Sequence, residues 1–133
     1  MENKEILEIA EFTLKRFTHP IEKPVFEVMK KTKFVKYLKD STIEANLEKT
    51  PAFVAHLPDG ELIVFCNEII EQLTSNMKDK RKFIEAVTMH ELFHIWNKHR
   101  CVTSEEALMS EEEVHEEIKK EFPGLAKVLE KFE

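Results

Sequence analysis

The stretch PAFVAHLPDGELIVFC, residues 51–66, contains the strongest β-strand signal in the chain. Two runs rich in apolar residues flank Pro58, Asp59 and Gly60, which are residue types typical of a tight hairpin turn. The sequence therefore predicts two antiparallel strands joined by a short turn. This hairpin decides the fold class, because the sequence on both sides of it has the periodicity of helices.

Helical patterns precede the hairpin. Apolar side chains recur on one face of residues 3–17, and His19-Pro20 ends this segment. A second, shorter helix is predicted over about residues 29–47. The lysines of residues 30–39 alternate with apolar side chains at helical spacing, which indicates a solvated lysine face rather than a nucleic-acid patch.

Three helices are predicted after the hairpin. Asn67 is expected to cap a short first helix, and Asp79 is expected to cap a second helix over about residues 80–98. The third helix, which is rich in acidic residues, is predicted to begin at Thr103 or Ser104.

The acid-rich helix is expected to end at Pro123-Gly124, and the apolar tail LAKVLEKF, residues 125–132, follows it. The sequence has no repeat and no linker, so we predict a single domain over residues 1–133. Its predicted class is α+β, mostly helical, with a hairpin or small sheet before the histidine-containing helix.

Composition indicates a soluble, globular protein, since 35% of the residues are charged and 42% are hydrophobic. The longest apolar run, LIVFC at 62–66, is too short to span a membrane, and the charged N-terminal residues do not resemble a signal peptide. Cys66 and Cys101 do not form a pair with ligand spacing, so we interpret both as reduced thiols of a cytoplasmic protein.

Glycine content and charge argue against nucleotide or nucleic-acid binding. Gly60 and Gly124 are the only glycines, so the chain has no glycine-rich loop to hold a phosphate. The net charge is −6, and the excess of acidic residues lies in the last 33 residues. We therefore expect neither nucleic acid nor membrane as a partner.

The stretch TMHELFHIWNKH, residues 88–99, places two histidines four residues apart. On a helix His90 and His94 lie one turn apart and about 40° round the axis, so both imidazoles can bind one Zn²⁺. Glu91 would lie beside the metal without ligating it, where a carboxylate can take a proton from water. The flanking residues are apolar nearly all round, which predicts a buried helix. The alternative is a pair of core histidines satisfied by hydrogen bonds.

The segment HELFH resembles the signature of the zincin metallopeptidases, with bulky apolar residues at both variable positions. With the short length, the preceding hairpin and the acid-rich downstream helix, the chain is most similar to the minimal gluzincins, the minigluzincins. The resemblance covers about residues 51–122 and is specific at His90, Glu91 and His94. It implies a zincin-like fold, Zn²⁺ as cofactor and endopeptidase activity.

The same resemblance implies two further features. A "glutamate helix" supplies the third zinc ligand, and a strand of the sheet forms an upper rim that pairs with an extended substrate. Either hairpin strand could do this, and by its order in the chain LIVFC is the one that we expect at this rim. Our prediction for the third ligand is Glu113, because 18 residues separate it from His94, a spacing that some large gluzincins use. Ser110 and Glu113 also fit a capping box, which is a purely structural explanation.

Other side chains are alternative third ligands: Glu111, Glu106, His115 and His99. Glu111 shares a stripe with Val114 and Ile118 if the helix runs unbroken from residue 104. His99 would point about 180° from His90 on a continuous helix, which disfavours it. Tyr37, His99 and His115 are weaker candidates for oxyanion stabilisation or ligand orientation, and a surface or packing role is the simpler interpretation.

The predicted function is that of a zinc-dependent endopeptidase of peptides or unfolded protein segments, with Glu91 as general base and His90, His94 and Glu113 as metal ligands. Two alternatives are a regulatory protease of one partner protein and a non-catalytic zinc-binding interaction module. A self-inhibited monomer or homodimer, with the tail 125–132 in its own or a neighbour's cleft, is a further alternative.

Overall fold

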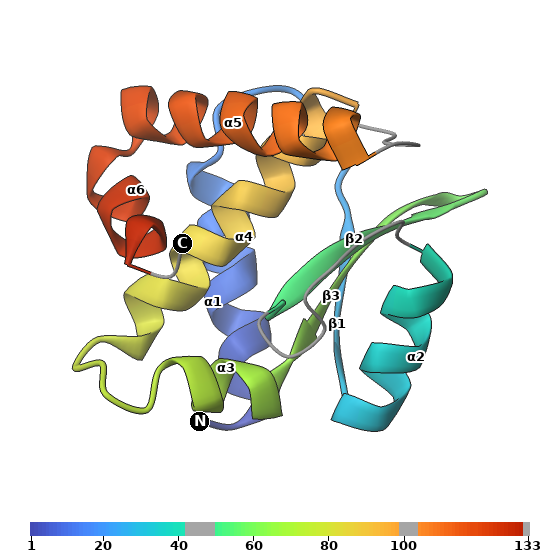
Figure 1. Cartoon of the computed structure of the whole chain (residues 1–133), viewed down its shortest axis with the longest axis vertical. Helices are drawn as coiled ribbons and strands as arrows, with labels where there is room; N and C mark the ends of the chain where they lie inside the picture. The colour runs from blue at the N-terminus through green and yellow to red at the C-terminus, as the bar shows by residue number, and fades with distance from the viewer. Residues whose placement is uncertain (42–49, 99–103, 132–133) are drawn as a thin grey trace.

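The computed structural model describes residues 1–41, 50–98 and 104–131. Within these ranges it contains six helices and a three-stranded sheet, so the α+β prediction is confirmed (Figure 1). The helices are α1 (Asn3–Arg16), α2 (Lys31–Ser41), α3 (Asn67–Leu73), α4 (Lys80–Trp96), α5 (Ser104–Glu121) and α6 (Pro123–Glu130). The strands are β1 (Val25–Met29), β2 (Ala52–Leu57) and β3 (Gly60–Cys66).

The sheet has the order β1-β3-β2. Strands β2 and β3 form the predicted antiparallel hairpin, in which Leu57 pairs with Gly60 across the turn. Gly60 has φ 145°, a backbone conformation that side chains with a Cβ rarely adopt, so the turn requires glycine there. Strand β1 pairs in parallel with β3 and was not predicted. It is short and has Glu27 at its centre, so its sequence lacks the apolar alternation of a strand.

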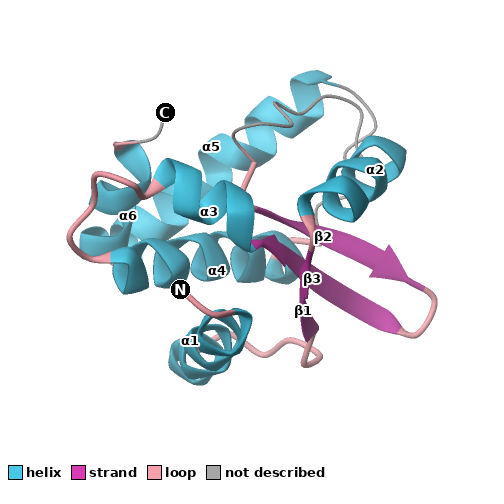
Figure 2. Cartoon of the chain, turned by 90° about the horizontal axis from the view of Figure 1, so that it is seen from below, coloured by secondary structure: helices cyan, strands magenta, loops and turns pink. Residues whose placement is uncertain are grey.

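Helices cover both faces of the sheet (Figure 2). Ile63 and Phe65 of β3 belong to the larger hydrophobic core, which includes side chains of α1 and α4. Val64, between them, points to a smaller core with Phe34 of α2 and Phe53 of β2. The central strand is therefore buried on both faces, which explains why its sequence is continuously apolar rather than alternating.

Helix α4 is the central helix and contacts α1, α5, α6 and β2. Its apolar side chains are buried nearly all round, as the sequence predicted. The Asp79 side chain accepts a hydrogen bond from the Lys82 backbone N–H at 3.1 Å, so the predicted cap of this helix is confirmed. The position of α4 in turn fixes the direction in which its few polar side chains point.

Two local predictions were wrong. Cys66, not Asn67, is the N-cap of α3, and the Asn67 amide instead donates to the Met1 carbonyl at 2.7 Å. The tail after Gly124 forms α6, which packs against α4 and α5 and buries Leu125 and Val128 in the larger core. The tail sequence is apolar because it completes this core.

The predicted second helix begins at Lys31 rather than at residue 29, because Met29 belongs to β1, and the rest of its predicted span lies partly outside the described residues. Cys66 is buried, and this burial raises the pKa of its thiol. Cys101 lies outside the described residues. In the part of the chain that the structure describes, no helix has the length and apolar character needed to cross a membrane.

The cap of α4 gives a first prediction. Asp79→Ala should lower the free energy of unfolding by about 1 kcal/mol, because the Lys82 N–H loses its acceptor. Urea denaturation of the metal-free protein measures this change. Asp79→Asn keeps a side-chain oxygen and should unfold at the wild-type midpoint. Equal stability of Asp79→Ala and wild type would contradict the assigned cap.

Candidate metal centre

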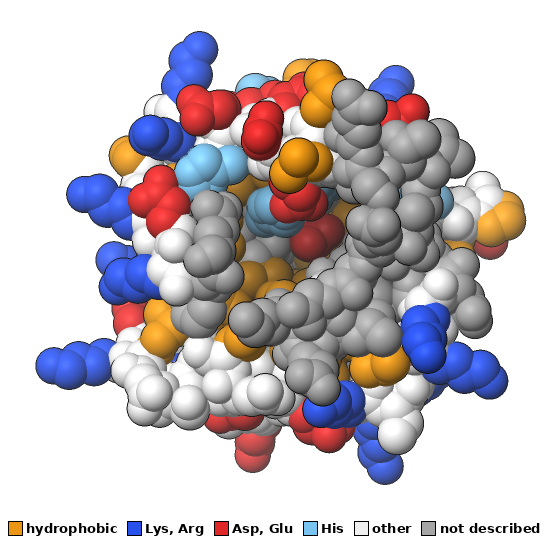
Figure 3. Space-filling view, viewed as in Figure 1, with side chains coloured by type: hydrophobic (Ala, Val, Ile, Leu, Met, Phe, Trp, Pro, Cys, Tyr) orange, Lys and Arg blue, Asp and Glu red, His pale blue; other side chains and the backbone are white. Residues whose placement is uncertain are grey.

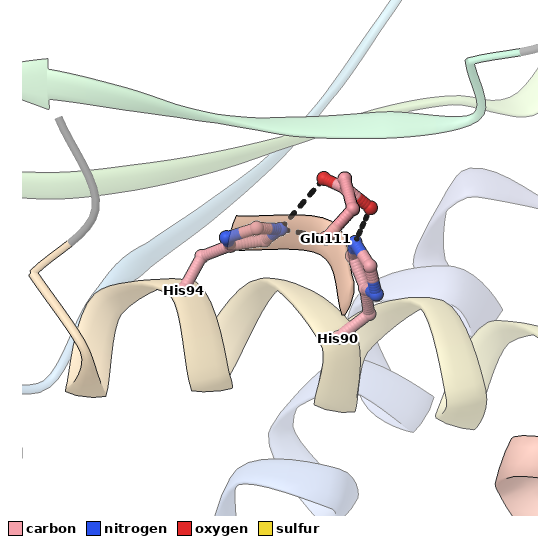
Figure 4. Close-up of side chains that lie close together, drawn as sticks. All are labelled: His90, His94 and Glu111. Atoms are coloured by element: carbon pink, nitrogen blue, oxygen red, sulfur yellow. Dashed lines mark hydrogen bonds and ion pairs between the residues drawn. The ribbon is translucent and has the colours of Figure 1, made fainter. Parts of the chain in front are cut away.

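His90 and His94 project from the same side of α4, one turn apart (Figure 4). Their Nε2 atoms are 3.0 Å apart and their ring centroids 4.6 Å apart. Both side chains are mostly buried, with exposed fractions of 19% and 14%. The spacing of four residues on a helix produces this proximity directly, as the sequence predicted.

Glu111 of α5 completes a group of three. Its Oε2 lies 2.8 Å from His90 Nε2 and its Oε1 lies 2.9 Å from His94 Nε2 (Figure 4). Within residues 1–41, 50–98 and 104–131, this is the one group of three His, Cys, Asp or Glu side chains whose ligand atoms converge in this way. Figure 3 shows acidic and histidine side chains gathered in the upper half of the face, below α5. Helices α4 and α5 therefore meet at a polar cluster.

The structure brings Glu111, rather than the predicted Glu113, to the two histidines. Helix α5 runs unbroken from Ser104 to Glu121, and it buries Val114 and Ile118 against the core. Glu111 lies three residues before Val114 and seven before Ile118, on the face that these side chains share. Glu113 lies about 200° round the axis from Glu111 and is not a member of the group.

The choice of Glu113 came from a spacing within the resemblance, whereas the helical stripe already pointed to Glu111. The capping-box interpretation is wrong, because Ser110 lies in the interior of α5 and is buried there. A cap residue would instead precede the first turn of the helix.

The remaining candidates lie elsewhere or outside the described residues. His115 Nε2 is 3.1 Å from Glu130 Oε1 of α6, which makes it part of the α5–α6 contact. The Tyr37 ring packs 5.6 Å from that of Phe53, in the smaller core. Glu106 is exposed and is not in the group of three, and His99 lies outside the described residues.

The separations of the ligand atoms allow a test of whether a metal ion fits. In a tetrahedral zinc site with bonds of about 2.05 Å, neighbouring ligand atoms lie about 3.3 Å apart. The three observed distances, 3.0, 2.9 and 2.8 Å, are shorter by a few tenths of an ångström. The space between these three side chains can hold either one proton on each imidazole Nε2, donated to the Glu111 carboxylate, or one cation. The donor set of two imidazoles and one carboxylate is one that Zn²⁺ accepts.

Glu91 follows His90 on α4 and is 8% exposed. Burial raises the pKa of Glu91, the His90 charge lowers it and the Glu111 charge raises it, and together these bring the pKa to about 8. Glu91 is therefore protonated at neutral pH when no cation is nearby. A positive ion bound by His90, His94 and Glu111 would lower the pKa of Glu91, because it stabilises the Glu91 carboxylate.

Glu111 has the opposite behaviour. Partial removal from water by itself raises the pKa of Glu111, but the hydrogen bonds and charges of His90 and His94 outweigh this and hold the pKa well below its usual range. Its side chain is 55% exposed, so the group opens to solvent on the side of α5. The site thus keeps one carboxylate ionised and its neighbour protonated.

Strand β2 lies at the edge of the sheet beside the cluster. It contacts α4 and runs past the two histidines (Figure 4). The expectation that LIVFC forms the rim was wrong: this segment is β3, which pairs with a strand on both sides and has no free edge. The strand that offers an edge here is β2, with the sequence AFVAHL.

No protein-family model matches the chain, and comparison with curated proteins and with solved structures likewise found no match.

The unusual state of Glu91 predicts a pH dependence of the metal-free protein. The pKa of Glu91 is 4.5 as a reference value and about 8 in the folded chain, so between these values the folded state holds a proton that the unfolded state releases. The free energy of unfolding should therefore fall as pH rises from about 4.5 to about 8 and then level off. Urea denaturation with chelator present measures it.

Glu91→Gln is the matched variant, since it keeps the side-chain shape without the titration. The difference in stability between Glu91→Gln and wild type should grow in favour of the variant across the same pH window. A difference that stays constant from pH 4.5 to 8 would show that Glu91 is not held protonated.

Proposed function

We propose that the protein is a zinc-dependent endopeptidase in which His90, His94 and Glu111 bind the metal and Glu91 acts as general base. The observation that carries this proposal is the convergence of two imidazoles and one carboxylate within 3.0 Å of one another, with a buried carboxyl group beside them. The sequence resemblance of HELFH to the zincin signature supports the same assignment.

The metal site fits hydrolysis better than a structural role. Structural zinc sites are closed by four protein ligands, whereas catalytic sites have three and leave one position open. The group here has three ligands in the described part of the chain, and its carboxylate is partly exposed. A bound Zn²⁺ would lower the pKa of a water molecule and polarise the carbonyl of a peptide bond.

Glu91 supplies the proton chemistry in this proposal. It lies beside the ligands without being one of them, and its pKa responds to charge at the site. A carboxylate with a pKa near the working pH can take a proton from water and later return it to the leaving amine nitrogen. A purely structural zinc site would not need such a group.

The edge strand β2 supports peptides as the substrate class. Among the described residues β2 is an edge strand and runs past the histidines, so its backbone groups could pair with an extended chain. Only a peptide or an unfolded protein segment can adopt the extended form that such pairing needs. A regulatory protease that cuts one partner would use the same chemistry.

Self-inhibition by the C-terminal tail has no support, because the tail is a core helix. Leu125, Ala126 and Val128 of α6 are buried between α4 and α5. Truncation after Gly124 would therefore expose core side chains and unfold the protein rather than release a cleft.

The third ligand gives a prediction for metal affinity. Glu111→Ala should lower the affinity for Zn²⁺ by more than about 100-fold, the upper range for groups that only support a ligand. Glu113→Ala, two residues away on another face of α5, should bind zinc as wild type does. Competition against a chromophoric chelator measures both constants. If Glu113→Ala loses zinc and Glu111→Ala does not, Glu113 rather than Glu111 is the third ligand.

The general base gives a prediction for activity. Glu91→Gln should retain zinc and fold but hydrolyse peptides about 10²- to 10⁴-fold more slowly, because the proton acceptor is lost. Cleavage of a denatured, fluorescently labelled protein measures the rate, and zinc content is determined in parallel. The double variant His90→Ala/His94→Ala serves as the metal-free control. Wild type that binds zinc but cuts no unfolded protein would favour the zinc-binding interaction module.

A further inference from the structure

The position of α5 decides whether Glu111 reaches the histidines, and apolar packing alone does not fix it. Two large apolar side chains of α5, Val114 and Ile118, are fully buried. These two side chains select the face of α5 that meets the core. Hydrogen bonds are directional and can set the rotation of the helix more closely, and two are found in the C-terminal half of α5.

The first directional bond comes from Asn97, the C-cap residue of α4. Its side-chain Nδ2 donates to Glu117 Oε2 of α5 at 2.8 Å and to the Phe93 carbonyl of α4 at 2.8 Å. Both partners are acceptors, so the amide nitrogen must face them and both of its hydrogens are used. Asn97 therefore ties the end of the histidine helix to α5.

The second directional bond lies one turn further along α5. Glu121 Oε2 is 2.8 Å from His19 Nε2, on the segment between α1 and β1. The His19 ring stacks on Trp96 of α4, with centroids 4.8 Å apart and an interplanar angle of 24°. Glu117 and Glu121 lie one turn apart on α5. Through them this side of α5 is bonded to Asn97 at the end of α4 and to His19, which stacks on Trp96 of α4.

A small rotation of α5 would matter at the metal site. Glu117 lies six residues after Glu111, which is about 9 Å along the helix axis, so Asn97 acts at a distance from the ligand atoms. A side-chain tip about 6 Å from the axis moves about 1 Å when the helix turns by 10°. This displacement is larger than the agreement of about 0.2 Å that is expected of metal–ligand distances, so a change in the orientation of α5 would disturb the ligand geometry.

We propose that Asn97 and Glu117 are positioning residues, which orient α5 so that Glu111 completes the metal site formed with His90 and His94. The proposal rests on the proposed metal site but concerns residues that do not touch the metal. It gives Glu117 a role in orienting the helix, which its exposed neighbours such as Glu116 do not share. Asn97 acts from the same helix as the histidine ligands, three residues after His94.

The test compares variants of Glu117 by two measurements. Zn²⁺ affinity is determined by chelator competition, and the visible absorption of the Co²⁺-loaded protein reports the number and geometry of the ligands. Glu117→Ala should lower zinc affinity by about 10-fold or more and alter the Co²⁺ spectrum, as loss of an outer support does. Glu117→Gln keeps an acceptor oxygen for Asn97 and should retain both. Glu116→Ala, at an exposed neighbouring position, is the matched control and should match wild type.

A reciprocal exchange separates positioning from general destabilisation. Asn97→Asp places a carboxylate opposite Glu117 and should weaken zinc binding, because neither group can donate. Adding Glu117→Gln restores a donor–acceptor pair between the two helices with reversed polarity, although the bond from residue 97 to the Phe93 carbonyl stays lost. The double variant should therefore recover part of the zinc affinity and of the Co²⁺ spectrum that Asn97→Asp loses. The metal-free melting temperature of every variant shows whether the chain is folded.

Distinct outcomes overturn this inference and the proposed function. If Glu117→Ala and Asn97→Asp are less stable but bind zinc with wild-type affinity and spectrum, Asn97 and Glu117 are only structural and the positioning role is wrong. A double variant that binds zinc no better than Asn97→Asp also overturns it. Wild type that binds no Zn²⁺ overturns the proposed function itself, and the positioning role with it.

Discussion

The burial of α4 is the constraint on which the rest of the structure depends. This helix contacts α1, α5, α6 and the edge strand β2, so its apolar side chains leave it no freedom to rotate. His90 and His94 project from one side of this helix, and their direction is set by the packing of its other faces. An exposed helix with the same motif would present the two imidazoles, but it would not hold them against a second carboxylate.

The same burial sets the electrostatics. Glu91 loses water on α4 and is held protonated, whereas Glu111 reaches the two imidazoles from α5 and is held ionised. The two carboxyl groups therefore depart from ordinary behaviour in opposite directions within one cluster. Separation of pKa values between neighbouring acids is typical of acid–base chemistry, because one group can donate where the other stabilises charge. A cation held between His90, His94 and Glu111 would stabilise the negative charge of both Glu91 and Glu111.

Patterns that act within one element could be predicted from the sequence. The hairpin followed from two apolar runs and a Pro-Asp-Gly turn, the cap of α4 from Asp79, and the approach of His90 to His94 from helical geometry alone. Features that depend on contacts between elements could not. Strand β1 has no strong pattern of its own and exists because it pairs with β3. Helix α6 does have a helical pattern, with Pro123 at its start and Leu125, Val128 and Leu129 on one face, but the core that buries this face is formed by other elements.

The choice of glutamate on α5 shows why spacing is a weaker guide than packing. Exposed carboxylates cost almost nothing in water, so an acid-rich helix can carry many of them. Its sequence does not distinguish the glutamate that meets the two histidines from a solvated neighbour. The distinction arises when Val114 and Ile118 choose the buried face, since Glu111 lies beside that face and Glu113 does not. The number of residues between His94 and a glutamate does not say which face of α5 that glutamate occupies. The apolar stripe does, because it records which side of the helix meets α4.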